Sequence, residues 1–146
     1  FIHFARNLMN YKAPLNLLGQ IKTETKDGIK SFNIKEHLKP LEIMARIYAL
    51  KYKITKPGTI SRLRKLSEIK DINPDTFREM IYVFDYLWRL RFSNQILSHV
   101  DLKTVNDELD LNSINDIERL NLRNVLSKIT EFQTKLSYDY LAGERF

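Results

Sequence analysis

Apolar residues recur every three to four positions along most of the chain, which is the spacing that places them on one face of an α-helix. Short polar or proline-containing stretches interrupt the pattern and mark where one helix ends and the next begins. The periodic stretches predict five helices, over about residues 1–11, 38–52, 59–69, 74–97 and 113–141.

Residues with strong capping preferences support these boundaries. Asn73 followed by Pro74 is the clearest start signal, because Asn caps a free N–H and Pro tolerates the first helical position. Pro40 is expected near the first turn of the second helix for the same reason. The remaining signals are Thr59 as an N-cap, Ser113 with Asp116 as a weak capping box, and Gly143 as a C-terminal stop.

A change of period near the N-terminus predicts a small β-hairpin over residues 20–34. Thr23 and Thr25 alternate with charged residues, and Lys26-Asp27-Gly28 forms a turn sequence. An isolated hairpin is marginal in water, so this one must pack on the helices or on another domain. Residues 100–112 lack a period and are interpreted as an acidic loop. The predicted fold is mainly all-α: an antiparallel bundle of four to five helices with a β-hairpin insertion near the N-terminus.

The 146 residues, with 43% hydrophobic and 29% charged content, are typical of one globular domain that covers residues 1–146. Because no Cys is present, disulfides, thiol catalysis and cysteine-based metal sites are excluded. The chain has no apolar run long enough for a membrane span, and we expect a cytoplasmic protein without a membrane partner. It begins with Phe1 rather than Met, which predicts a fragment or a processed piece of a longer protein.

Positive charge is concentrated in the first half of the chain. Residues 1–70 contain 15 Lys or Arg and 5 Asp or Glu, whereas residues 71–146 contain 9 and 13, so the net charges are +10 and −4. The basic half is either a solvated face that pairs partly with the acidic half, or a surface for phosphate or an acidic domain. Nucleic-acid binding is disfavoured because no RNA- or DNA-binding motif is present. The densest basic stretch contains Lys51, Lys53, Lys56, Arg62, Arg64, Lys65 and Lys70.

The residue patterns of common catalytic and metal sites are missing. The four Gly are isolated, so they form no phosphate-binding loop, and the three His lack the spacing of metal ligands on one helix face. Asp107, Glu108 and Asp110 are interpreted as part of the acidic loop rather than as a metal site. The sequence therefore predicts no catalytic residue, no metal ligand and no cofactor for this chain, which by itself is not an enzyme.

Cationic and amide side chains inside the apolar stripes are the remaining candidates for binding. Arg46 lies within the second helix, and Arg91, Asn94 and Gln95 share one face of the long helix at spacings of three and four. A guanidinium beside two amides can bind a phosphate or a carboxylate. The alternative is a structural Arg that pairs with Asp85 or with carbonyls at a helix end.

Several short motifs occur in a characteristic order. They are Ala5-Arg6-Asn7, Pro14-Leu15, Asn33-Ile34-Lys35, Pro40-Leu41, Ala45-Arg46, Tyr48-Ala49-Leu50, Thr59 with Arg62-Leu63, Phe84 to Leu87, Leu90-Arg91 to Gln95, and Leu126, Ile129, Phe132-Gln133 and Leu136 in the last helix. Together they resemble, over nearly the whole chain, the putative nucleotidyltransferase substrate-binding domain family. Proteins of that family are bacterial and begin with regulatory CBS pairs or a cyclic-nucleotide-binding domain. A GlnD-like nucleotidyltransferase domain follows, and the helical domain is the C-terminal piece. The chain departs from the family pattern at Asn33, which replaces an acid, and at residues 37–39, where a glycine usually precedes Pro40.

The resemblance implies a non-catalytic bundle that packs beside its own upstream nucleotidyltransferase domain and lines the substrate cleft. Catalysis would belong to that domain, which in this superfamily uses a Gly-Ser and an Asp-x-Asp motif to hold the nucleotide and two metal ions. For the parent protein it implies Mg²⁺ and a nucleoside triphosphate, with a nucleotide or a protein as the substrate. The residues carried over to the cleft or to the domain contact are Arg6, Asn7, Lys35, Arg46, Arg91 and Gln95.

Three alternatives stay open. The bundle could relay a signal through protein contacts, coupling an upstream regulatory ligand-binding domain to the catalytic domain. Two copies of the chain could associate through apolar surface that lacks its partner domain. A helical ribonuclease would need an Arg and a His four to six residues apart, and the seven residues between Arg91 and His99 disfavour it.

Overall fold

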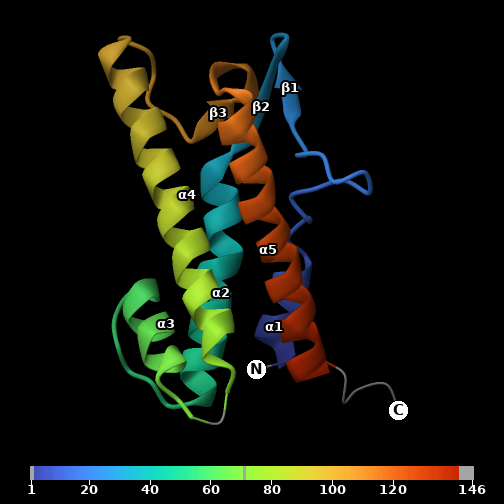
Figure 1. The fold of residues 1–146 in the computed structure, drawn as a ribbon, viewed down its shortest axis with the longest axis vertical. Coiled ribbons are helices and arrows are strands. Elements are labelled where there is room, and N and C mark those ends of the chain that lie inside the picture. Colours follow the sequence, from blue (N-terminus) through green and yellow to red (C-terminus); the bar gives the residue numbers. More distant parts are fainter. Residues whose placement is uncertain (1, 71, 142–146) are drawn as a thin grey trace.

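The computed structural model describes residues 2–70 and 72–141, and this part of the chain forms five α-helices with a small antiparallel sheet at one end (Figure 1). The predicted mainly all-α bundle with a hairpin near the N-terminus is confirmed. Gly143, the predicted stop of the last helix, lies outside the described residues. The elements are α1 (Ile2–Met9), β1 (Glu24–Lys26), β2 (Ile29–Asn33), α2 (Ile34–Lys51), α3 (Thr59–Ser67), α4 (Pro74–Val100), β3 (Glu108–Asp110), the 3₁₀ turn η1 (Leu111–Ser113) and α5 (Asp116–Leu141).

The helix starts follow local hydrogen bonding, which confirms one predicted cap and corrects two. Asn73 caps α4 as predicted, accepting the Asp75 N–H at 2.9 Å. The predicted box at Ser113 is wrong because Ser113 belongs to η1. Thr59 is the first residue of α3 and not its cap, a position that Gly58 occupies with a φ of 75°. The box that starts α5 is Asn115 with Glu118: each side chain accepts the backbone N–H of the other residue at 2.9 Å.

The second helix starts at Ile34, earlier than the predicted residue 38. Asn33 is both the last residue of β2 and the N-cap of α2, where its side chain accepts the Glu36 N–H at 3.0 Å. Pro40 therefore lies inside the helix and not in its first turn, at the cost of one backbone hydrogen bond. The apolar periodicity did not predict this first turn because β2 runs directly into α2 without an intervening loop.

The predicted hairpin is part of a three-stranded sheet in the order β1-β2-β3. Asp27 and Gly28 have φ angles of 52° and 78°, the two left-handed positions of a tight hairpin turn. The predicted loop over residues 100–112 is corrected, because β3 pairs with β2 and places Leu109 opposite Phe32. Both side chains are buried, so this pairing covers the end of the helical core.

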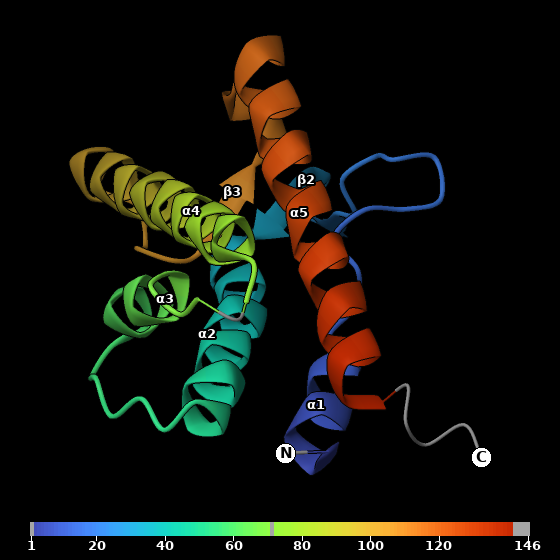
Figure 2. The same ribbon diagram turned by 60° about the horizontal axis from the view of Figure 1, so that its bottom comes forward.

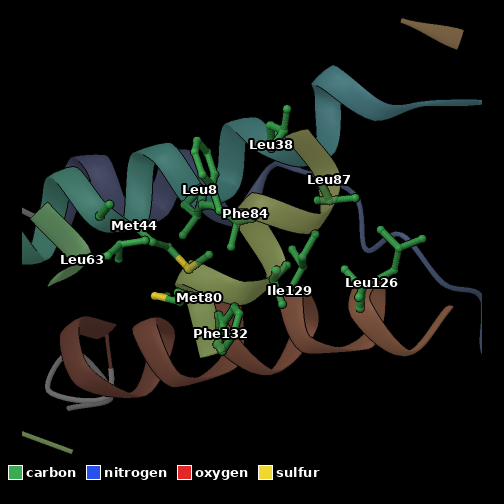
Figure 3. Packing of buried hydrophobic residues seen from close by; sticks show 14 of the residues in the cluster. Leu8, Leu38, Met44, Leu63, Met80, Phe84, Leu87, Leu126, Ile129 and Phe132 are labelled. Carbon is green, nitrogen blue, oxygen red and sulfur yellow. The ribbon is translucent and has the colours of Figure 1, made fainter. Parts of the chain in front are cut away.

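The core lies between α2, α4 and α5, with α1 and α3 closing its sides (Figure 3). Helix α2 packs against all four other helices. Helix α4 packs against α2, α3 and α5. Buried side chains of the core include Leu8, Leu38, Met44, Leu63, Met80, Phe84, Leu87, Leu126, Ile129 and Phe132.

Helix α1 is held beside the C-terminal half of α5 (Figure 2). Gln133 of α5 is a buried polar residue, and its amide donates to the carbonyls of Leu8 and Tyr11, both at 3.4 Å. On the neighbouring side, the Tyr48 hydroxyl of α2 donates to Asp139 of α5 at 2.6 Å. Burial raises the pKa of Tyr48, so it remains a donor. These contacts attach α1 and α2 to the same helix, α5.

Candidate functional site

The six predicted site residues fall into two groups towards opposite ends of α2. One group surrounds a hollow between α1 and α2, and the other surrounds a single carboxylate beside the sheet. The first contains Asn7 and Arg46, with exposed Arg6 next to Asn7 on α1, and the second contains Lys35, Arg91 and Gln95.

The first group lines what we call the α1–α2 hollow, a cavity of about 500 Å³. Its floor is apolar, from Ile43, Ile47 and Leu50 of α2, and α1 and the residues after it contribute Asn7, Asn10 and Tyr11. Arg46, an exposed residue of α2, is the charged residue among those that line it. A cavity of this size that combines an apolar side with several polar groups can hold a small molecule.

The second group binds a carboxylate of the chain itself. Arg91 Nε and Gln95 Nε2 donate to the same Asp107 oxygen at 2.6 and 2.9 Å, and both partners of the ion pair are less than one-fifth exposed. The Arg91 guanidinium also lies 4.8 Å from the centre of the Trp88 ring. The hydrogen bond from Arg91 lowers the pKa of Asp107, aided by Gln95 and Lys35 and opposed by partial burial. Arg91 thus forms a structural ion pair, but its partner is Asp107 and not the predicted Asp85. Asp85 pairs instead with Arg89 at 2.7 Å.

The same face of α4 fastens the start of β3. Asn94 donates to the Glu108 carbonyl at 3.1 Å, and Asn33 donates to the Glu108 carboxylate at 2.5 Å. The Ile34 N–H, at the start of α2, donates to the Asp107 carbonyl at 2.9 Å. Arg91, Asn94 and Gln95 thus hold residues 107–108 against α4. The sequence pattern did not indicate this segment as their partner.

A second cavity, which we call the sheet-side hollow, was not predicted. It has a volume of about 620 Å³ and lies between the sheet, the N-terminal half of α2 and the segment after α1. His37 lines it, with its ring stacked on Phe32 at 4.3 Å and Nδ1 2.8 Å from the Asn33 carbonyl. Burial lowers the pKa of His37, which favours the neutral ring. His37 was a weak signal in the sequence because the hollow that it lines is formed by segments far apart in the chain.

Comparison with known proteins decides the family. The sequence model of the family described as "Putative nucleotidyltransferase substrate binding domain" matches residues 1–140. The chain belongs to this family. The match includes both hollows and the Asp107 contacts. No curated protein and no solved structure matches the chain.

Membership in the nucleotidyltransferase substrate-binding family agrees with a binding rather than a catalytic role for the chain. Across residues 2–70 and 72–141, no group of three or more His, Asp or Glu side chains could hold a metal ion. Among the helices described here, none is long and apolar enough to cross a membrane. The ribonuclease alternative would use His99 and Arg91 together. His99 is exposed on α4, and Arg91 forms an ion pair with Asp107.

The basic stretch between residues 51 and 70 is largely solvated in this member of the family. It contains seven Lys or Arg and one acid, so its net charge of +6 equals that of the whole chain. Its ion pair in the described structure is local, between Lys65 and Glu68 at 2.7 Å. Arg64 is exposed on α3, and among the described residues no ion pair joins this stretch to residues 72–141.

Proposed function

We propose that this chain is the substrate-binding and docking side of a nucleotidyltransferase, and that the phosphates of a nucleotide bind in the α1–α2 hollow at Arg46. Catalysis, with its Mg²⁺ ions, belongs in this proposal to an upstream domain that closes over the hollow. The observation that carries the proposal is a cavity of about 500 Å³ that has apolar side chains along α2 and one charged lining residue, Arg46.

The chemistry of the lining supports an anionic ligand. A guanidinium presents several N–H donors in a plane, which suits the oxygens of a phosphate. The amides of Asn7 and Asn10 add donors from the opposite wall. The apolar floor from Ile43 and Ile47 excludes water on one side, which strengthens the attraction between the bound charges.

The test is calorimetric titration of the chain with ATP, GTP, CTP and UTP in the presence of Mg²⁺. We expect saturable binding of at least one nucleotide, weakened tenfold or more in Arg46→Ala because a charged hydrogen bond is worth about 1.5–3 kcal/mol. Arg64→Ala removes the same charge from the exposed face of α3 and should bind like the wild type. Absence of binding, or equal weakening in both variants, would reject the proposal.

The second candidate, a bundle that relays signals through protein contacts, is favoured by the C-terminal half of α4. Phe92, Ile96 and Val100 follow one another at intervals of four and are 62%, 47% and 69% exposed. A contiguous apolar ridge on a helix is typical of a contact with another domain. Hydrogen exchange over residues 88–100 tests it: a docked α4 exchanges more slowly in the full-length protein than in this chain, and equal rates would exclude docking there.

A further inference from the structure

The α1–α2 hollow and the sheet-side hollow adjoin each other along α2. Asn10 and Tyr11 line both of them. Of the α2 residues in the two linings, Glu36, Pro40, Ile43, Ile47 and Leu50 recur at helical spacing and share one face, and His37 and Arg46 border this face on opposite sides. The two cavities are neighbouring parts of one groove, with Tyr11 at the junction.

The two parts of the groove differ in charge. The described lining of the α1–α2 hollow contains one charged residue, Arg46, so this part favours an anion. The lining of the sheet-side hollow contains three lysines and three glutamates, so its charges balance. A ligand that fits both parts has an anionic end and a neutral polar end. The balanced residues are Lys12, Lys22, Lys39, Glu24, Glu36 and Glu108.

His37 gives the neutral part a specific hydrogen-bonding group. Its Nδ1 lies 2.8 Å from the Asn33 carbonyl, and because a carbonyl only accepts, Nδ1 carries the proton. In the neutral ring Nε2 is then an acceptor that remains for a ligand. Stacking on Phe32 at 4.3 Å holds the ring in place. An acceptor in a hollow that Tyr11 and Asn10 also line suits a heteroaromatic ring that carries N–H donors.

We infer that the two hollows form one elongated nucleotide site, in which Arg46 binds the phosphates and the nucleobase lies in the sheet-side hollow and donates to His37. This inference rests on the proposed function and adds to it the orientation of the ligand and a residue that recognises the base. His37 and Arg46 are nine residues, or about two and a half turns, apart on α2, with a rise of about 13 Å between them. They therefore border the groove from opposite sides, and a nucleotide that reaches both lies obliquely across the shared face of α2.

The test compares the best-binding nucleoside triphosphate with inorganic tripolyphosphate, which has the charges but no base. His37→Phe keeps an aromatic ring against Phe32 and removes both ring nitrogens. We expect it to weaken the nucleotide about tenfold and tripolyphosphate less than twofold. Arg46→Ala should weaken both ligands, and His99→Phe, at an exposed histidine of α4, should weaken neither.

A measurement on the unaltered chain avoids the effect of His37→Phe on folding. The ¹⁵N chemical shift of His37 Nε2 should move when the nucleotide is added and stay in place with tripolyphosphate. An unmoved Nε2 signal, or a His37→Phe variant that weakens both ligands equally, would overturn the base site while the phosphate site at Arg46 stands. Failure of both ligands to bind would overturn the proposed function and this inference together.

Discussion

The two halves of α4 have similar apolar content but different environments. From Phe77 to Leu87, five apolar side chains are buried, with at most 7% of their surface exposed. From Trp88 to Val100, the large apolar side chains of Phe92 and Leu97 are each 62% exposed. The second half is fastened by polar contacts, in which Arg91 and Gln95 bind Asp107.

The difference teaches that a helical period predicts a helix but not what covers it. The first half of α4 lies beside α2, α3 and α5, which bury its apolar face. The second half lies beyond α3 and meets β3 through side-chain hydrogen bonds. Apolar burial and an ion pair therefore stabilise different parts of one helix, and mutations can separate the two.

The largest expected effect is in the buried half. Phe77 is 1% exposed and lies edge-on to Tyr48, with ring centres 5.2 Å apart. Phe77→Ala should lower the free energy of unfolding by about 3–5 kcal/mol, because it removes buried surface and leaves a cavity. Urea unfolding followed by circular dichroism measures this. The matched variant Phe92→Ala, in the exposed half of α4, should change the free energy of unfolding by less than about 0.5 kcal/mol. Similar losses for both variants would contradict the difference in burial between the two halves.

An intermediate effect is expected from the ion pair of the second half. Arg91→Ala leaves Asp107 partly buried without its main partner and should cost about 2 kcal/mol. Arg89→Ala on the same helix breaks an exposed pair of nearly equal length and should cost about 0.5 kcal/mol or less. The same urea titration compares them. If the two variants are equally stable, the Asp107 contact does not hold β3 to α4.

The smallest effect is the pH dependence of this contact. The folded pKa of Asp107 is lowered, so the ion pair stabilises the fold above the ordinary aspartate pKa of about 3.9 and is lost as pH falls through the lowered value. Asp107→Asn removes the titrating group, so the difference in stability from the wild type should shrink between neutral and acidic pH. Asp85→Asn, in the exposed pair, provides the control. If the difference in stability between Asp107→Asn and the wild type stays constant down to pH 2, the prediction is contradicted.

Much of the fold was predictable because its signals are local. Asn73-Pro74 marks the start of α4, and Asp27-Gly28 marks the hairpin turn, since each depends on the conformational preferences of adjacent residues. The start of α2 was missed because Asn33 ends a strand and caps a helix at once. Strand β3 was missed because its partner β2 lies more than seventy residues away in sequence.

The candidate site was predictable only in part. The sequence grouped Arg91 with Gln95 correctly, since residues four apart share a helix face. That they bind Asp107 depends on where the segment between α4 and β3 returns, which no local pattern encodes. Arg46 was singled out by the family motif, and the structure adds Asn10, Tyr11 and the cavity beside it. His37 had no visible role until the sheet and α2 came together around it.

The sequence by itself determined the helical class, the hairpin turn at Asp27-Gly28 and the start of α4, because these follow from side-chain period and backbone preference between near neighbours. It also indicated the family through the order of its motifs. Only the tertiary structure decided which half of α4 is covered, which carboxylate Arg91 binds, and that α1 and α2 enclose a hollow. The reason is that these features join segments far apart in the chain, whose meeting depends on the packing of the whole core.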